Sequence, residues 1–173
     1  MIRVEPLTGH HDRSRFDCGV PALDTWLRQI APQHQRKGIS RTFVAVPLDE
    51  PSVQTWQRGG YDDIGPASIL GFHALAAAVV LVENLPPAST KSYPRQIPVT
   101  RLGRLATRQD LQGQGLGRLL LADAIQRARV AAQAVGSAGI FVDAKDEVAA
   151  RFYRHFGFQS CRDAPLQLYL PLW

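Results

Sequence analysis

Residues 102–121 read Leu-Gly-Arg-Leu-Ala-Thr-Arg-Gln-Asp-Leu-Gln-Gly-Gln-Gly-Leu-Gly-Arg-Leu-Leu-Leu. The pattern is typical of a strand, a glycine-rich turn and the first turns of a helix. The turn, residues 112–117, carries a glycine at every second position, so its backbone can approach a ligand with no Cβ in the way. The helix directs unpaired N–H groups and the positive end of its dipole toward the same space. The sequence therefore predicts an anion-binding loop suited to a pyrophosphate.

The segments on both sides of this loop agree with that interpretation. Apolar residues after the loop recur every three or four positions, which predicts an amphipathic helix. These residues are Leu116, Leu120, Ala124, Ala128 and either Ala131 or Ala132. Before the loop, the apolar side of the strand changes near Gly103, which is typical of a β-bulge. A buried strand with an incidental glycine fits the same pattern equally well.

The spacing of the glycines narrows the choice of ligand. A Walker loop requires Gly-Lys-Ser/Thr, and the turn contains no such lysine. A dinucleotide fingerprint requires G-x-G-x-x-G in an early strand–helix–strand unit, whereas this turn reads G-x-G-x-G and lies late in the chain. Gln112, Gly115 and Gly117 instead match Q/R-x-x-G-x-G/A. This pattern resembles the pyrophosphate loop of the GNAT superfamily of acetyl-CoA-dependent N-acetyltransferases.

A second motif strengthens the resemblance. Residues 149–158 read Ala-Ala-Arg-Phe-Tyr-Arg-His-Phe-Gly-Phe, similar to the A-x-x-F-Y-x-x-x-G-F segment that follows the fifth strand of GNAT enzymes. Core packing explains Phe152, Phe156 and Phe158. It also remains open for Tyr153, but the resemblance implies that this tyrosine faces the coenzyme sulfur and acts as a catalytic general acid.

The N-terminal half of the chain narrows the resemblance further. Residues 16–27, 38–44 and 102–106 resemble the tRNA-acetylating GNAT toxins of bacterial type II toxin–antitoxin systems. Such toxins transfer acetyl from acetyl-CoA to the α-amino group of aminoacyl-tRNA and so block translation. The resemblance implies one GNAT domain over residues 1–173. It also implies an α/β (α+β) fold whose mixed, mostly antiparallel twisted sheet is flanked by about four helices and opens in a V at the acetyl-CoA site.

The same resemblance supplies candidate site residues, with acetyl-CoA as co-substrate and no metal. The candidate coenzyme-binding residues are Leu105, Ala106, Thr107, Gln112, Gly113, Gln114, Gly115, Leu116, Gly117 and Arg118. The candidate tRNA-binding residues are Arg36, Lys37, Arg41, Lys91 and Arg95, although scattered basic residues are more often solvated surface. The expected partners are aminoacyl-tRNA, a cognate ribbon-helix-helix antitoxin and a second copy of the chain.

The expected chemistry needs no strong general base. An α-amine next to an ester is less basic than an ordinary α-amine, whose pKa is about 8, so much of it is neutral at physiological pH. The departing thiolate benefits from a proton donor, and the phenol of Tyr153 suits that role. His34, His73 and His155 stay open as bases, although packed or surface histidines are the simpler interpretation.

Composition sets outer limits on the function. The 173 residues are 45% hydrophobic and 20% charged, which is ordinary for a globular protein. The net charge of +5 favours an anionic partner. We see neither a membrane span nor a signal-peptide pattern and expect a cytoplasmic protein. Cys18 and Cys161 make neither a disulfide framework nor a metal set.

Periodicity and turn residues predict the remaining elements. Strands are expected over 2–4, 39–46, 69–82, 139–143 and 167–170, and a helix over 146–155. Residues 16–27 should open a further helix, with Pro21 in its first turn. Pro32 should interrupt the first helix, and Gly38 should end the short helix that follows. Residues 47–66 are rich in Pro, Gly, Asp and Gln, so we expect a loop, and residues 85–98 should be irregular.

Two other functions remain open from the sequence. One is an N-acetyltransferase that acts on a small amine, an antibiotic or a protein N-terminus. A cationic amine needs an acidic groove, for which Asp62 and Asp63 are the obvious pair. The other is a non-catalytic GNAT domain that binds coenzyme A or a partner protein, against which the intact loop and Tyr153 argue. The sequence does not indicate which amino acid or tRNA is the acceptor.

Overall fold

The computed structural model describes residues 1–90 and 93–173 of the chain. The chain divides into two compact units: unit 1 is Met1–Ala74 with Arg104–Asp123, and unit 2 is Leu75–Gly103 with Ala124–Trp173. Strands β3 and β4 and helix α4 each contribute residues to both units. That residues 1–173 form a single domain stays a prediction.

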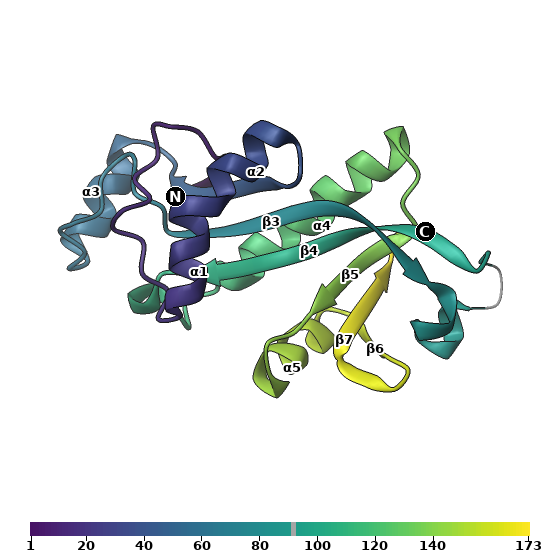
Figure 1. The fold of residues 1–173 in the computed structure, drawn as a ribbon. Helices are drawn as coiled ribbons and strands as arrows, with labels where there is room; N and C mark the ends of the chain where they lie inside the picture. Colours follow the sequence, from purple (N-terminus) through teal and green to yellow (C-terminus); the bar gives the residue numbers. More distant parts are fainter. Residues whose placement is uncertain (91–92) are drawn as a thin grey trace. The chain divides into compact units, whose positions relative to one another are not determined.

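Seven strands are described, in the order β1-β2-β3-β4-β5-β7-β6, and Figure 1 labels β3 to β7. They are Ile2–Pro6 (β1), Arg41–Pro47 (β2), Gly71–Leu81 (β3), Gln96–Thr107 (β4), Gly139–Asp143 (β5), Gln159–Cys161 (β6) and Ala164–Pro171 (β7). The pairs β1–β2, β5–β7 and β6–β7 are antiparallel, whereas β4–β5 is parallel. β4 and β5 pair only from Thr100 to Leu102. The predicted mixed sheet is confirmed, while the V-shaped opening beyond this pairing stays a prediction.

The helices form four main stretches among the described residues. Their bounds are Pro21–Thr25 (α1), Trp26–Ile30 (η1, a π-helical turn), Ala31–Lys37 (α2), Glu50–Arg58 (α3), Leu116–Ala134 (α4) and Glu147–His155 (α5). α1, η1 and α2 follow one another without a break, so they count as one stretch, and the expected four helices are found. Short 3₁₀ turns cover Val82–Asn84, Pro87–Ser89 and Gln109–Leu111. Within the described residues, no helix is both long and apolar enough to span a membrane.

Two apolar clusters lie on opposite faces of the strands in unit 1. The first cluster joins Leu27 to Val44, Phe72 and Ala106. The second cluster is Ala45, Ile64, Leu70, Leu111, Leu116 and Leu120. Neighbouring residues of β2 point into different clusters because side chains alternate along a strand. The second cluster therefore ties the residues on both sides of the glycine loop to the core.

The expected interruption at Pro32 takes another form, because the helix widens instead of breaking. Proline lacks an N–H and its ring clashes with the carbonyl four residues earlier. In η1 the N–H of Ala31 bonds to the carbonyl of Trp26, five residues back. The Arg28 carbonyl, four residues before Pro32, accepts a hydrogen bond from the Arg13 guanidinium instead. Gly38 ends α2 in the left-handed region at φ +71°, as predicted.

The prediction of a loop over residues 47–66 is wrong, because α3 (Glu50–Arg58) occupies the first half of this segment. The carboxylate of Asp49 accepts from the backbone N–H of Ser52 at 2.9 Å and caps the helix, and Pro51 lies in the first turn. Val53 is buried and Trp56 packs on the second cluster, one helical turn apart. The proline and aspartate that suggested a loop are N-terminal helix signals.

The apolar side of β4 changes because its two halves contact different cores. Ile97 and Val99 are buried in a third cluster, which unit 2 builds around Phe141 and Tyr169. Leu105 packs on the second cluster and Ala106 on the first, so both faces of the strand end are covered. This burial accounts for the broken alternation, and the bulge at Gly103 stays a prediction.

Unit 2 matches most of the predicted elements. Helix α5 starts as expected, since the Asp146 carboxylate accepts from the backbone N–H of Ala149 at 2.8 Å. Strands β5 and β7 are also confirmed. β6 was not predicted, because its three residues are too few to show a period.

Candidate active site

The glycine loop has the backbone geometry that its sequence predicts. Gly113 and Gly115 have φ values of +82° and +86°, in the left-handed region that residues with a Cβ rarely adopt. No other atom lies within 4 Å of the position where a Cβ would stand at either glycine. The loop needs glycine for its conformation, and the space beside it is open.

Helix α4 begins at this loop. The N–H of Leu119 bonds to the carbonyl of Gly115 at 3.2 Å, which makes Gly115 the N-cap residue. The N–H groups of residues 116–118 therefore have no acceptor within the helix. Leu116 is buried, whereas residues 112–115 are exposed. An exposed backbone at the positive end of a helix is suited to bind a phosphate.

The side chains of the loop are used by the protein itself. The Gln112 amide donates to the Cys18 carbonyl at 3.3 Å, and the Gln114 amide donates to the Tyr61 hydroxyl at 2.8 Å. Arg118 is exposed on the first turn of α4. The backbone of residues 112–115 is thus left for the predicted contacts with a coenzyme, in keeping with the alternating glycines.

The end of β4 leads directly into the loop. Ala106 is buried and Leu105 and Thr107 are partly buried. A Cβ on Gly71 would stand 2.9 Å from the Ala106 carbonyl oxygen, so β3 approaches this segment closely. The N–H of Arg108 then bonds to the Leu70 carbonyl at 2.9 Å. The backbone of residues 105–107 is therefore held in place. That its N–H groups face an acetyl carbonyl stays a prediction.

Tyr153 lies in unit 2, on α5. Its side chain is buried, with its ring edge-to-face against Phe158 and Phe152 at centroid distances of 5.5 and 5.3 Å. Burial raises the pKa of the Tyr153 hydroxyl to about 12, so the phenol keeps its proton at neutral pH. The Tyr153 ring is therefore part of the core, and its hydroxyl is protonated at neutral pH.

Of the three histidines left open as bases, two contact other side chains of the protein and the third is exposed. His34 contacts the Ser40 hydroxyl through Nδ1 at 3.3 Å, and its ring lies edge-on to Trp26. His73 is fully buried, with Nε2 2.7 Å from the Asp123 carboxylate. His155 is exposed at the end of α5. A buried imidazole such as His73 has no access to an acceptor amine.

Three of the five predicted tRNA-binding residues lie close together in the fold. Arg36 and Lys37 end α2, and Arg41 begins β2 four residues later, with its guanidinium 3.2 Å from the Gln35 carbonyl. All three are exposed, as is Arg95 in unit 2. Lys91 lies outside the described residues.

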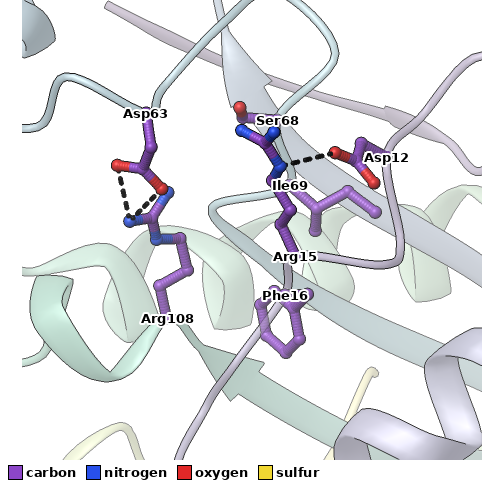
Figure 2. Close-up of a pocket in the computed structure, with 7 residues that line it drawn as sticks. All are labelled: Asp12, Arg15, Phe16, Asp63, Ser68, Ile69 and Arg108. Atoms are coloured by element: carbon purple, nitrogen blue, oxygen red, sulfur yellow. Dashed lines mark hydrogen bonds and ion pairs between the residues drawn. The ribbon is translucent and has the colours of Figure 1, made fainter.

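A small hollow in unit 1 contains Asp63, one of the two acids considered for a small-amine site. The residues that line it are Asp12, Arg15, Phe16, Asp63, Ser68, Ile69 and Arg108. Figure 2 shows Asp63 bound to Arg108 and Asp12 paired with Arg15. The Asp63 carboxylate is paired with Arg108 at 3.1 Å, while half of its side chain stays exposed.

Sequence reasoning missed the residues that support the loop. Tyr61 and Asp63 come from the segment interpreted as a loop, and Arg108 was not singled out. Two signals were present in the sequence: two acids near a tyrosine after the helix, and an arginine directly before the loop. Over the described part of the chain, no three His, Cys, Asp or Glu side chains are grouped as a metal site.

Two comparisons of sequence decide the family. Residues 74–160 match the family described as the acetyltransferase (GNAT) domain. The tRNA-acetylating toxin of Mycobacterium tuberculosis is 36% identical over 159 residues, which cover 92% of this chain and 85% of the toxin. The chain belongs to the GNAT acetyltransferase family.

Solved structures agree with the GNAT assignment. AtaT complexed with acetyl-methionyl-tRNAfMet superposes with a TM-score of 0.84 at 30% identity and covers 99% of this chain and 95% of AtaT. A mutant of AtaT bound to the C-terminus of the antitoxin AtaR and to acetyl-CoA has a TM-score of 0.74 at 28% identity, covering 99% and 93%. The predicted GNAT family and fold are confirmed, and this GNAT chain is an acetyltransferase.

Proposed function

We propose that this protein is the toxin of a toxin–antitoxin pair and transfers acetyl from acetyl-CoA to the α-amino group of aminoacyl-tRNA, which blocks translation. The observation that carries the proposal is the extent of the similarity. A tRNA-acetylating toxin is similar in sequence over 92% of the chain, and the structure of AtaT complexed with acetyl-methionyl-tRNAfMet is similar over 99%. The similarity covers the N-terminal half as well as the GNAT motifs.

Acetyl-CoA binds, in this proposal, to the exposed loop at the start of α4. The backbone N–H groups of residues 113–118 hold the pyrophosphate, with Arg118 as an adjacent positive charge. The N–H groups of Leu105, Ala106 and Thr107 polarise the thioester carbonyl, where negative charge develops during attack. The two units act together as one GNAT domain over residues 1–173.

The reaction exchanges one bond for another. The neutral α-amine attacks the thioester carbonyl, a C–N bond forms, and the C–S bond breaks. The amine loses a proton to water, and Tyr153 donates its phenolic proton to the departing thiolate. The raised pKa of Tyr153 keeps that proton in place until the thiolate forms, and solvent then restores it.

The acceptor side is positively charged in this proposal. Arg36, Lys37 and Arg41 of unit 1 contact tRNA phosphates. Lys91 and Arg95, which lie in the stretch 85–98, do so as well. Phosphate contacts of this kind supply affinity without reading the sequence. The alternative acceptor, a small cationic amine, is less well supported, because Asp63 is already paired with Arg108.

The partners follow from the same proposal. AtaT binds the C-terminus of its antitoxin AtaR, and we expect a cognate antitoxin of the ribbon-helix-helix type here. A homodimer is also expected from the resemblance to these toxins. Charged tRNA is found in the cytoplasm, so the reaction takes place there.

The deciding experiment supplies the purified protein with labelled acetyl-CoA and charged tRNA. We expect acetyl-aminoacyl-tRNA as product, with deacylated tRNA as an inert control. Induced expression in bacteria should arrest growth, and the recovered aminoacyl-tRNA should carry an extra acetyl group. Acetylation of polyamines or aminoglycosides, with charged tRNA left untouched, would replace this proposal with the small-amine alternative.

A further inference from the structure

The segment that follows α3 contacts the glycine loop through one tyrosine. The Tyr61 hydroxyl accepts a hydrogen bond from the Gln114 amide at 2.8 Å and lies 3.4 Å from the Asp110 carbonyl, to which it donates. The Tyr61 ring packs edge-on against Trp56 of α3 at a centroid distance of 5.5 Å. Tyr61 therefore links α3 to the residues before and within the loop.

A second contact holds the entry to the loop. The Arg108 guanidinium lies 3.1 Å from Asp63 and 2.7 Å from Asp110, and only 10% of its side chain is exposed. Burial acts to lower the pKa of Arg108, but its hydrogen bonds to Asp110 and Asp63 raise that pKa overall. Arg108 thus stays charged and fixes the turn between β4 and the loop.

The opposite side of the loop is held by residues 17–18. The N–H of Gln109 donates to the Asp17 carbonyl at 2.8 Å, and the Gln112 amide donates to the Cys18 carbonyl. Two separate segments of unit 1 thus contact residues 108–114. Gly113 lies between these contacts and Gly115 directly follows them, and their backbone freedom makes an untethered loop costly to order.

We infer that Tyr61 and Asp63 are positioning residues for acetyl-CoA, because they hold the glycine loop in its binding conformation before the coenzyme arrives. The inference rests on the proposed function of the loop. A ligand that meets a preordered loop loses less free energy to ordering on binding. The connection after α3 is therefore part of the coenzyme site, although none of its residues needs to touch the coenzyme.

The test compares Tyr61→Phe, Gln114→Ala and the double variant by calorimetry with acetyl-CoA. One neutral hydrogen bond corresponds to a change in Kd of about two- to tenfold. We expect each single variant to raise Kd by that factor and the double variant to add little more, since both remove the same contact. For Tyr61→Phe, KM for acetyl-CoA should rise in parallel with Kd. Unchanged Kd in both single variants overturns the inference.

Hydrogen exchange separates positioning from general stability. In the free protein, the amides of residues 112–117 should exchange faster in Tyr61→Phe, and bound acetyl-CoA should remove the difference. Tyr93→Phe is the matched control, because it removes a hydroxyl that lies 3.3 Å from that of Tyr169 in unit 2. Faster exchange throughout unit 1 would make Tyr61 merely structural and overturn the inference.

A second pair of variants tests the acidic contact independently. Asp63→Asn should raise Kd for acetyl-CoA, whereas the exposed neighbour Asp62→Asn should not. If Gly115→Asp retains full coenzyme binding, the proposed role of the loop fails. If Gly115→Asp abolishes binding while Tyr61→Phe and Asp63→Asn leave it unchanged, only the positioning role fails.

Discussion

Tyr153 combines two properties that a proton donor to a thiolate requires. Its ring is fixed between Phe152 and Phe158, and its hydroxyl keeps its proton because burial raises the pKa to about 12. A phenol with this pKa is a weaker acid than a thiol, whose ordinary pKa is about 8.5, so its acidity alone does not drive the transfer. In the proposed reaction the proton is transferred only as negative charge develops on the sulfur and the C–S bond breaks.

Replacing Tyr153 with Phe removes one oxygen and keeps the packed ring. General acid assistance typically contributes about a hundred- to ten-thousand-fold in rate. We expect a folded variant that binds acetyl-CoA normally and transfers acetyl at least about a hundredfold more slowly, which is roughly 3 kcal/mol of barrier. Turnover, calorimetry and circular dichroism measure these three properties. Turnover within a few-fold of wild type would assign the proton to another donor, such as water.

Gly115→Asp places a carboxylate where the phosphate is expected. The φ of +86° strains any residue with a Cβ, and the new negative charge repels the anion at the start of α4. We expect calorimetry to detect no acetyl-CoA binding while the fold survives. Gly136→Asp is the control, because that glycine is exposed, has open space around it and lies outside the loop. Retained binding in Gly115→Asp would remove the loop from the coenzyme site.

Helix α3 shows how an element can support a site from outside it. Its N-cap Asp49 accepts hydrogen bonds from the N–H and hydroxyl of Ser52 at 2.9 and 2.6 Å, and its Trp56 packs against Tyr61. Asp49→Ala should lower the melting temperature by a few degrees. It should also weaken acetyl-CoA binding, because the support for Tyr61 loosens. Asp62→Ala, an exposed acid beyond the helix, is the control. A lowered melting temperature with unchanged coenzyme binding would separate α3 from the site.

Elements with a long, regular apolar pattern could be predicted from the sequence. The buried stripe of α4 was identified, with Ala132 rather than Ala131 buried, and the helix predicted over 146–155 is α5, with Asp146 as its cap. α3 was missed because its nine residues contain few apolar positions and its capping residues are also turn residues. The contacts of Tyr61 and Asp63 were missed for another reason. They join residues about fifty positions apart, and a single sequence shows the acids, the tyrosine and the arginine without showing which of them pair.

The net charge of +5 is spread over the surface, so its effect on tRNA binding depends on where the charges gather. If Arg36, Lys37 and Arg41 bind phosphates, changing all three to Gln should weaken binding of charged tRNA. The change should also lower the slope of log affinity against log salt by about two. Filter binding between about 50 and 200 mM salt measures both. A control that changes Arg58, Arg129 and Arg162 to Gln removes the same charge from other exposed positions. Equal losses in the two triple variants would indicate a general charge effect.

The π-helical turn Trp26–Ile30 amounts to a one-residue insertion in an otherwise regular helix. Each residue of an α-helix turns the chain by about 100°, so the extra residue sets the rotation of everything that follows it. Shortening this turn by one residue would swing Arg36 and Lys37 by about 100° around the helix axis. The direction in which this basic end points is therefore encoded in the length of the segment, and Pro32 fixes that length by forbidding the ordinary hydrogen bond.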